Sequence, residues 1–173
     1  TYTVVEGENA AVANAGANYN TLANAISSAA SGDTITLLKD TTEDITISGK
    51  DITLDLNGKK LTNIKDNTIT VATGATLTIT GTGTVDNVTH EKAAVYNKGT
   101  VTLAGGTYER SAEAGKDADN NGGNSFYTVL NHGNMIVKAG VVVNNKGKHS
   151  SLFENGYYNY KNSDGVENPT LTI

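Results

Sequence analysis

The chain has no cysteine, a single arginine and no long apolar run. Without cysteine it can form no disulfide and use no thiol in chemistry. Its 13 basic residues are outnumbered by 18 acidic ones, which gives a formal net charge of −5. Because nucleic-acid binding depends on clustered positive charge, we expect no nucleic-acid partner. No apolar segment approaches the length of a membrane-spanning helix and no signal peptide is recognisable, so we expect no membrane insertion.

A pattern of short alternating segments repeats along the chain. The segments 45–47 and 52–56 alternate apolar and polar residues, and Gly49 and the pair Asn57-Gly58 interrupt the alternation. Such alternation predicts short, half-buried strands. The pattern recurs at steps of 24 residues, lengthened to 34 or 36 by inserted loops, and its equivalent positions are Ile47, Val71, Val95, Val129 and Phe153 in one strand and Leu77, Val101, Met135 and Leu171 in the next.

Three short strands in each period of about 24 residues predict an all-β fold, a right-handed parallel β-helix. In this solenoid each rung stacks on the previous one around a shared apolar core. At one corner the same steps align Asn97, Asn131 and Asn155. We therefore expect a stack of side-chain amides that hydrogen-bond along the ladder.

The predicted domain covers residues 1–173, with rungs from 33 to 173 and inserted loops near 109–126 and 157–168. Residues 1–32 are expected to supply an N-terminal strand and an amphipathic capping helix. Apolar residues recur there at spacings of three and four, with Asn20 as the candidate N-cap and Gly32 after the helix; they are Tyr19, Leu22, Ala25, Ile26 and Ala29. Because the end of a β-helix exposes its core, a helix before the first rung is suited to cover it.

These segments resemble a known class of domains. The segments 19–26, 31–37 and 52–59 are similar to the start of the pectin-lyase-like right-handed β-helix domains of bacterial surface and secreted proteins, including adhesins. The resemblance extends over residues 19–110 and implies the β-helix fold. Such domains include polysaccharide lyases, glycoside hydrolases and non-catalytic adhesin modules, so the resemblance does not choose an activity.

An enzyme of this class would need acidic residues held close together. The resemblance implies that a lyase would use carboxylate-bound calcium and an arginine or lysine base, but no acidic cluster accompanies the sole arginine, Arg110. For a hydrolase, Asp86 and Glu91, with His90 between them, are the candidate acids at a rung corner. Solvated corner residues are the alternative interpretation. His132 and the other histidines show no metal-binding spacing, and we expect them on the surface.

The first inserted loop carries the pattern D-x-D-x-N-G at 117–122. Asp117, Asp119 and Asn121 would present alternate oxygen ligands to calcium, and glycine would allow the turn. Thr128 stands where an EF-hand places its bidentate glutamate, so the match is partial. A polar loop without metal is the alternative. Bound calcium would serve to order the loop.

The second inserted loop carries three tyrosines beside polar side chains. The rings of Tyr157, Tyr158 and Tyr160 can pack on the apolar face of a sugar, while Asn162 and Asp164 bond its hydroxyls. A protein contact would use the same residues. The third interpretation is that the rings cover the core at the last rung.

Thr-x-Thr pairs recur along the chain, at 34/36, 68/70, 76/78, 100/102 and 170/172. A flat array of threonines is one way to bind ice, although any sheet surface favours outward threonine. The helix, the inserted loops and the uneven pairing from rung to rung argue against ice.

Together these patterns predict a non-catalytic binding or adhesion module outside a bacterial cell, part of a longer surface protein. A glycan is the expected ligand, a host or cell-surface protein is the alternative partner, and calcium is the one cofactor suggested. A polysaccharide-degrading enzyme is the second hypothesis and a structural spacer without ligand is the third.

Overall fold

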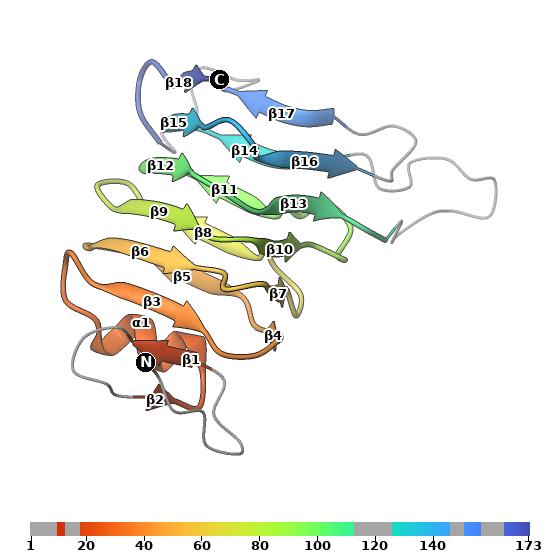
Figure 1. The fold of residues 1–173 in the computed structure, drawn as a ribbon. Coiled ribbons are helices and arrows are strands. Elements are labelled where there is room, and N and C mark those ends of the chain that lie inside the picture. Colours follow the sequence, from red (N-terminus) through yellow and green to blue (C-terminus); the bar gives the residue numbers. More distant parts are fainter. Residues whose placement is uncertain (1–9, 13–17, 113–125, 146–150, 157–164) are drawn as a thin grey trace.

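The computed structural model describes residues 10–12, 18–112, 126–145, 151–156 and 165–173. In this part of the chain the strands form three sheets (Figure 1). Sheet A has the order β18 (Thr170–Thr172), β15 (Asn134–Val137), β12 (Thr100–Leu103), β9 (Thr76–Thr80), β6 (Asp51–Asp55), β3 (Thr34–Leu37), β1 (Ala10–Val12) and β2 (Asn18–Tyr19). Sheet B has the order β16 (Val142–Asn145), β13 (Thr107–Arg110), β10 (Gly83–Asp86), β7 (Lys59–Thr62) and β4 (Thr41–Thr42). Sheet C has the order β17 (Ser151–Asn155), β14 (Tyr127–Asn131), β11 (Val95–Asn97), β8 (Ile69–Val71) and β5 (Ile45–Ile47).

From β3 onward the chain visits sheets A, B and C in turn, and each strand pairs in parallel with the strand three positions later. The two strands before β3 do not follow this rule, because β1 pairs antiparallel with both β2 and β3. The stacked, parallel arrangement is that of a parallel β-helix. The all-β fold class predicted from the alternating segments is therefore confirmed.

The predicted register is correct in most places and wrong at one. Ile47 pairs with Val71 and Val129 with Phe153, as the spacing predicts. Val95, however, pairs with Ile69 and not with Val71. The connection from β10 to β11 is two residues longer than that from β7 to β8, and the connection from β11 to β12 is two residues shorter than that from β8 to β9. The longer and the shorter connection cancel, so the rung keeps its total number of residues. The spacing of equivalent positions therefore did not reveal that β11 is displaced within the rung.

The core lies between the three sheets, at the inward positions of each strand. In β9, Leu77 and Ile79 are fully buried, whereas the threonines that alternate with them are half-exposed. Burial of such side chains contributes about 1.5–3 kcal/mol each. The same alternation supplies the rest of the core, which includes Leu54, Leu61, Val71, Val85, Val95, Val101, Leu103, Tyr108, Val129 and Met135.

The predicted amide ladder is present between sheets C and A. Asn97 donates from Nδ2 to Oδ1 of Asn131 at 2.7 Å, and Asn131 donates in the same way to Asn155 at 2.6 Å. The Oδ1 atoms of Asn97 and Asn131 also accept from the backbone N–H of Gly99 and Gly133. A side chain on Gly133 would collide with the carbonyl oxygen of Gly99. The Asn-x-Gly spacing thus lets successive turns stack closely.

The predicted helix is shorter than expected and begins one residue later. α1 spans Leu22–Ser28, and its N-cap is Thr21, whose Oγ1 accepts from the N–H of Asn24; Asn20 is not the cap. Tyr19 belongs to β2. Leu22, Ala25 and Ile26 are buried in the core, so the apolar face was predicted correctly. In the described part of the chain, no helix has the length and apolar content required to cross a bilayer.

Candidate functional site

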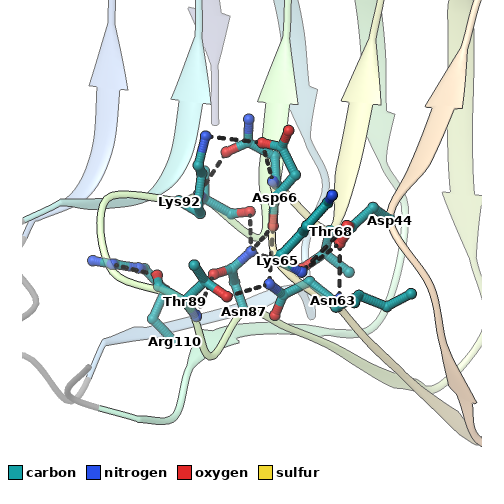
Figure 2. Close-up of polar contacts among 12 residues, drawn as sticks. Asp44, Asn63, Lys65, Asp66, Thr68, Asn87, Thr89, Lys92 and Arg110 are labelled. Atoms are coloured by element: carbon teal, nitrogen blue, oxygen red, sulfur yellow. Dashed lines mark hydrogen bonds and ion pairs between the residues drawn. The ribbon is translucent and has the colours of Figure 1, made fainter. Parts of the chain in front are cut away.

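Polar side chains from successive rungs gather where the chain turns from sheet B to sheet C (Figure 2). We call this region the B–C corner. The connection from β13 to β14, whose sequence includes the predicted calcium loop, begins at this corner, as does the connection from β16 to β17. The labelled members of the corner are Asp44, Asn63, Lys65, Asp66, Thr68, Asn87, Thr89, Lys92 and Arg110.

The local sequence explains why these polar residues face inward. In sheet B the inward positions are Leu61 in β7, Val85 in β10 and Tyr108 in β13, all fully buried. In each case the next inward position is two residues further along the chain, which falls just after β7 and β10 and at the end of β13. It is occupied by Asn63, Asn87 and Arg110, and Arg110 in turn pairs with Asn145. The corner therefore holds a second polar ladder.

Asn63 and Asn87 tie two successive rungs together through their side-chain amides. Both donate from Nδ2 to the carbonyl of Asp66 at 2.9 Å. Asn87 Nδ2 also contacts Oγ1 of Thr68 at 3.1 Å and the carbonyl of Ala93 at 3.0 Å, while Asn63 Nδ2 lies 2.7 Å from Oγ1 of Thr89. Asn63 and Asn87 are at most 2% exposed. Buried amides of this kind are stabilising only while all their partners are present.

Charged side chains cover the outer side of the corner. Asp44 accepts through Oδ1 from the N–H of Ile64 at 2.8 Å. Lys92 Nζ lies 3.0 Å from Asp66 Oδ1. The hydrogen bond from Lys92, followed by that from the N–H of Asn67, lowers the pKa of Asp66. These groups neutralise one another on the solvent side.

Arg110 is the sole arginine of the chain and is completely buried at this corner. Its Nη2 lies 3.4 Å from the carbonyl oxygen of Thr89, and its guanidinium lies 5.6 Å from the ring centroid of Phe126. Burial lowers the pKa of Arg110 to about 10, so the group still carries its charge at neutral pH. The prediction placed Arg110 at the start of an inserted loop; the structure places it at the end of β13, facing inward.

An ion-paired group lies on the outward side of sheet B beside the corner. Asp86 and Glu109 pair in register on β10 and β13, and Lys60 reaches both from β7, with Nζ 2.8 Å from Asp86 Oδ2 and 3.6 Å from Glu109 Oε1. The hydrogen bond to Asp86 raises the pKa of Lys60. Ser111 adds two donors to Asp86, its backbone N–H and its hydroxyl.

The two candidate acids for hydrolysis differ in exposure and in their partners. Asp86 is 1% exposed and bound to Lys60 and Ser111. Glu91 is 71% exposed and lies near His90, with 3.7 Å between Oε1 and Nε2. Glu91 adopts a left-handed backbone conformation with φ 56°, in the turn that makes this corner two residues longer than the one below.

His132 was expected on the surface and is instead 7% exposed. Its ring packs edge-on against Tyr96, with centroids 5.2 Å apart, and Nδ1 lies 3.3 Å from the hydroxyl of Tyr96. The prediction was wrong because His132 directly follows β14, where its ring packs against Tyr96 on the neighbouring strand β11 and is covered by it. His149 lies outside the described residues.

The predicted ligand residues cannot be placed in this arrangement. The glycan-binding candidates Tyr157, Tyr158, Tyr160, Asn162 and Asp164 lie outside the described residues, as do the calcium-binding candidates Asp117, Asp119 and Asn121. In the described part of the chain, no group of three or more histidine, aspartate or glutamate side chains is arranged to hold a metal ion. The B–C corner has amides, hydroxyls and ion pairs that bond one another, which suits a scaffold for the connections that leave it.

Comparison with models of known protein families, with curated proteins and with solved structures finds no match to this chain.

Sequence reasoning missed the second polar ladder and the role of Lys60. A signal for the ladder was present, because Asn63 and Asn87 stand 24 residues apart, which is the period of the repeat. Arg110 follows Asn87 at a spacing one residue shorter than the period, so a search at the period of the repeat does not find it. Lys60 has no such signal, since its partners lie on the two following rungs.

Proposed function

We propose that this chain is a non-catalytic, glycan-binding or adhesion module of a bacterial surface or secreted protein, acting outside the cell. In this proposal the domain is a right-handed, pectin-lyase-like β-helix with about 24 residues in each rung. α1 and β1 lie at the N-terminal end of the stack in Figure 1, and in this proposal they cover that end of the core. The sequence resemblance over residues 19–110 supports this assignment to a class.

One observation carries the preference for a binder over an enzyme. Asp86 and Glu109 are in-register acids on neighbouring strands, and Lys60 bridges them. A general acid needs a raised pKa and access to the bond that it cleaves. Asp86 is buried beneath a lysine and bonded by Ser111, so its charge is used to hold three rungs together.

The glycan assignment rests on the amino-acid types of the second inserted loop. Tyr157, Tyr158 and Tyr160 would stack on sugar rings, and Asn162 and Asp164 would bind hydroxyls. Calcium held by Asp117, Asp119 and Asn121 would order the first loop. A glycan-bearing host or cell-surface protein is the partner that this arrangement suits, and the domain would be one part of a longer chain.

The test is retention of the purified chain on a panel of immobilised polysaccharides and mucin glycans, in calcium and again in chelator, with released reducing ends measured. We expect retention without product. Glu91→Gln and Glu109→Gln leave the buried Asp86 in place and should change neither readout. Product release that falls in either variant would support the polysaccharide-degrading alternative, and the absence of retention in both buffers would favour a spacer.

A further inference from the structure

Sheet A presents an uncharged outward surface over its last four strands. We call it the threonine face; it consists of the outward residues of β9, β12, β15 and β18, which are Thr76, Thr78, Thr80, Thr100, Thr102, Asn134, Ile136, Thr170 and Thr172. All are exposed or half-exposed. The strands lie one above another in Figure 1.

The register aligns this face into two rows across the sheet. One row runs Thr78, Thr102, Ile136 and Thr172, and the other runs Thr76, Thr100, Asn134 and Thr170. The connections between these strands differ in length; the fourth strand, β18, returns threonine to both rows, whereas the third, β15, contributes Asn134 and Ile136. Neighbouring strands of a sheet are about 4.8 Å apart, and alternate residues of one strand about 6.7 Å apart. The rows therefore form a grid of methyl and hydroxyl groups that is interrupted in β15 by Asn134 and Ile136.

Charge is absent from the threonine face itself and begins at its border, where Asp51 and Asp55 of β6 pair in register with Thr76 and Thr80. The outward positions of β9, β12, β15 and β18 carry no charged side chain, and the nearest outward charges of sheet A are Asp51 and Asp55 on β6. The outward surfaces of the other sheets do carry charge, with Lys60 and Glu109 on sheet B and Glu154 on sheet C. A general preference of sheets for threonine does not by itself explain this absence of charge.

The hydroxyls of the face are available to a ligand. Among the described residues, the hydrogen bond between side chains within the face runs from Thr170 Oγ1 to Asn134 Oδ1 at 2.9 Å. The hydroxyls of Thr78 and Thr102 have no protein partner in that part of the chain. Each can donate and accept, while the adjacent methyl offers an apolar contact.

We propose that the threonine face binds an uncharged, regularly repeating polysaccharide presented as an extended surface. This inference rests on the proposed glycan-binding function and moves the main contact from the tyrosine loop to sheet A. The C–H faces of sugar rings would meet the methyl groups, and sugar hydroxyls would meet the threonine hydroxyls. An acidic polymer would find no compensating cation on this face, so electrostatic complementarity favours a neutral one.

The experiment is co-sedimentation of the full chain with microcrystalline cellulose and with chitin, with soluble alginate as the acidic probe. We expect retention on a neutral solid and none on alginate. The double variant Thr78→Lys/Thr102→Lys should bind at least about tenfold more weakly, because each lysine would lose hydration at the contact. Thr70→Lys, at a half-exposed outward position of sheet C, is the matched control and should bind as the parent does.

A milder variant keeps the test decisive if the lysines disturb folding. Thr78→Ser/Thr102→Ser retains the hydroxyls and removes the methyls, and it should reduce binding by a smaller factor, with an unchanged circular dichroism spectrum. Neutral-solid binding that survives both double variants would overturn the inference and leave the proposed function standing. Failure to bind any glycan of the wider panel would remove the proposed function itself. Adsorption to growing ice without polysaccharide binding would also overturn the inference.

Discussion

Glu43 and Lys50 hold the two ends of the same helix. Glu43 accepts from the N–H groups of Leu22 at 2.7 Å and Ala23 at 2.9 Å, at the start of α1. Lys50 Nζ donates to three carbonyls at the other end, those of Ile26, Ser27 and Ala29, at 2.7–2.8 Å. The two charges match the helix dipole and satisfy backbone groups that a helix leaves unpaired. They flank β5, so the first complete rung positions the helix.

Replacing Lys50 should destabilise the domain more than an average surface change. A helix of 7 residues is too short to persist without outside contacts, and Lys50→Met would remove three charge-assisted hydrogen bonds. We expect a loss of about 2 kcal/mol in the free energy of unfolding, measured by urea denaturation. Lys138→Met, at an exposed side chain directly after β15, is the control and should cost less than about 0.5 kcal/mol. Equal costs would show that the helix does not depend on Lys50.

The two ends of the helix should be energetically coupled. Glu43→Gln keeps the shape of the side chain and weakens its two bonds to Leu22 and Ala23, so we expect a loss of about 1 kcal/mol. If the helix unfolds once either end is released, the double variant with Lys50→Met will cost less than the sum of the single variants. A double-mutant cycle by urea denaturation measures this difference. Strict additivity would mean that each end is held independently.

The middle amide of the ladder should be the most sensitive to loss of its donor. Asn131→Asp keeps the acceptor for Gly133 but cannot donate to Asn155 or to the carbonyl of Thr170. It also places a buried charge beside acceptors, so we expect a loss of at least about 2 kcal/mol at pH 7. Asn144→Asp, on an exposed side chain of β16, is the matched control. Thermal unfolding followed by circular dichroism compares them, and similar melting temperatures would contradict the role given to the ladder.

The ion pair of Asp66 and Lys92 should contribute stability that depends on pH. The folded-state pKa of Asp66 lies below the ordinary value of 3.8, mainly because Lys92 donates to it. A carboxyl whose pKa is lowered by folding stabilises the protein above its unfolded pKa, and this contribution is lost as pH falls through the folded pKa. Both side chains are well exposed, so the effect should be below about 1 kcal/mol.

Asp66→Asn and Lys92→Met are the variants for this measurement. Each should be slightly less stable than the parent at pH 6, and the difference should shrink toward zero between pH 4 and pH 2, on the order of two pH units. Urea denaturation at several pH values gives the comparison. A difference that stays constant to the lowest pH would show that the loss comes from packing and not from the charge of Asp66.

The sequence was sufficient for the architecture and for one of its two polar ladders. Apolar alternation and a fixed step predict the stacked sheets, and Asn97, Asn131 and Asn155 were found because their steps match the period. Val95 was misplaced because a longer and a shorter connection compensate within one rung. Thr21 and Asn20 are both acceptable N-caps by residue type, and only the geometry of the helix start distinguishes them.

The burial of charged groups could not be read from the sequence. Arg110 and Asp86 lie at the end of strands, where the same residue types are usually solvated. Arg110 faces inward because it lies two residues after the inward-facing Tyr108 in the same strand. Asp86 is covered by Lys60 and Ser111, which belong to other rungs. Such contacts depend on which residues of neighbouring strands pair with each other. Because the connections between strands vary in length, the repeat spacing in the sequence predicts this pairing only to within a few residues.

The compensating connections around β11 also indicate how this fold can accept changes in length. Removing His90 and Glu91 alone would displace every later strand by one full pair of residues, whereas the same removal combined with two residues added after Asn97 would restore the arrangement of the rung below. A deletion at one corner is thus tolerable when an insertion at the next one cancels it. In evolutionary terms, residues lost from one connection of a rung and gained in the next would change the loops while the stacking of the rungs is inherited unchanged.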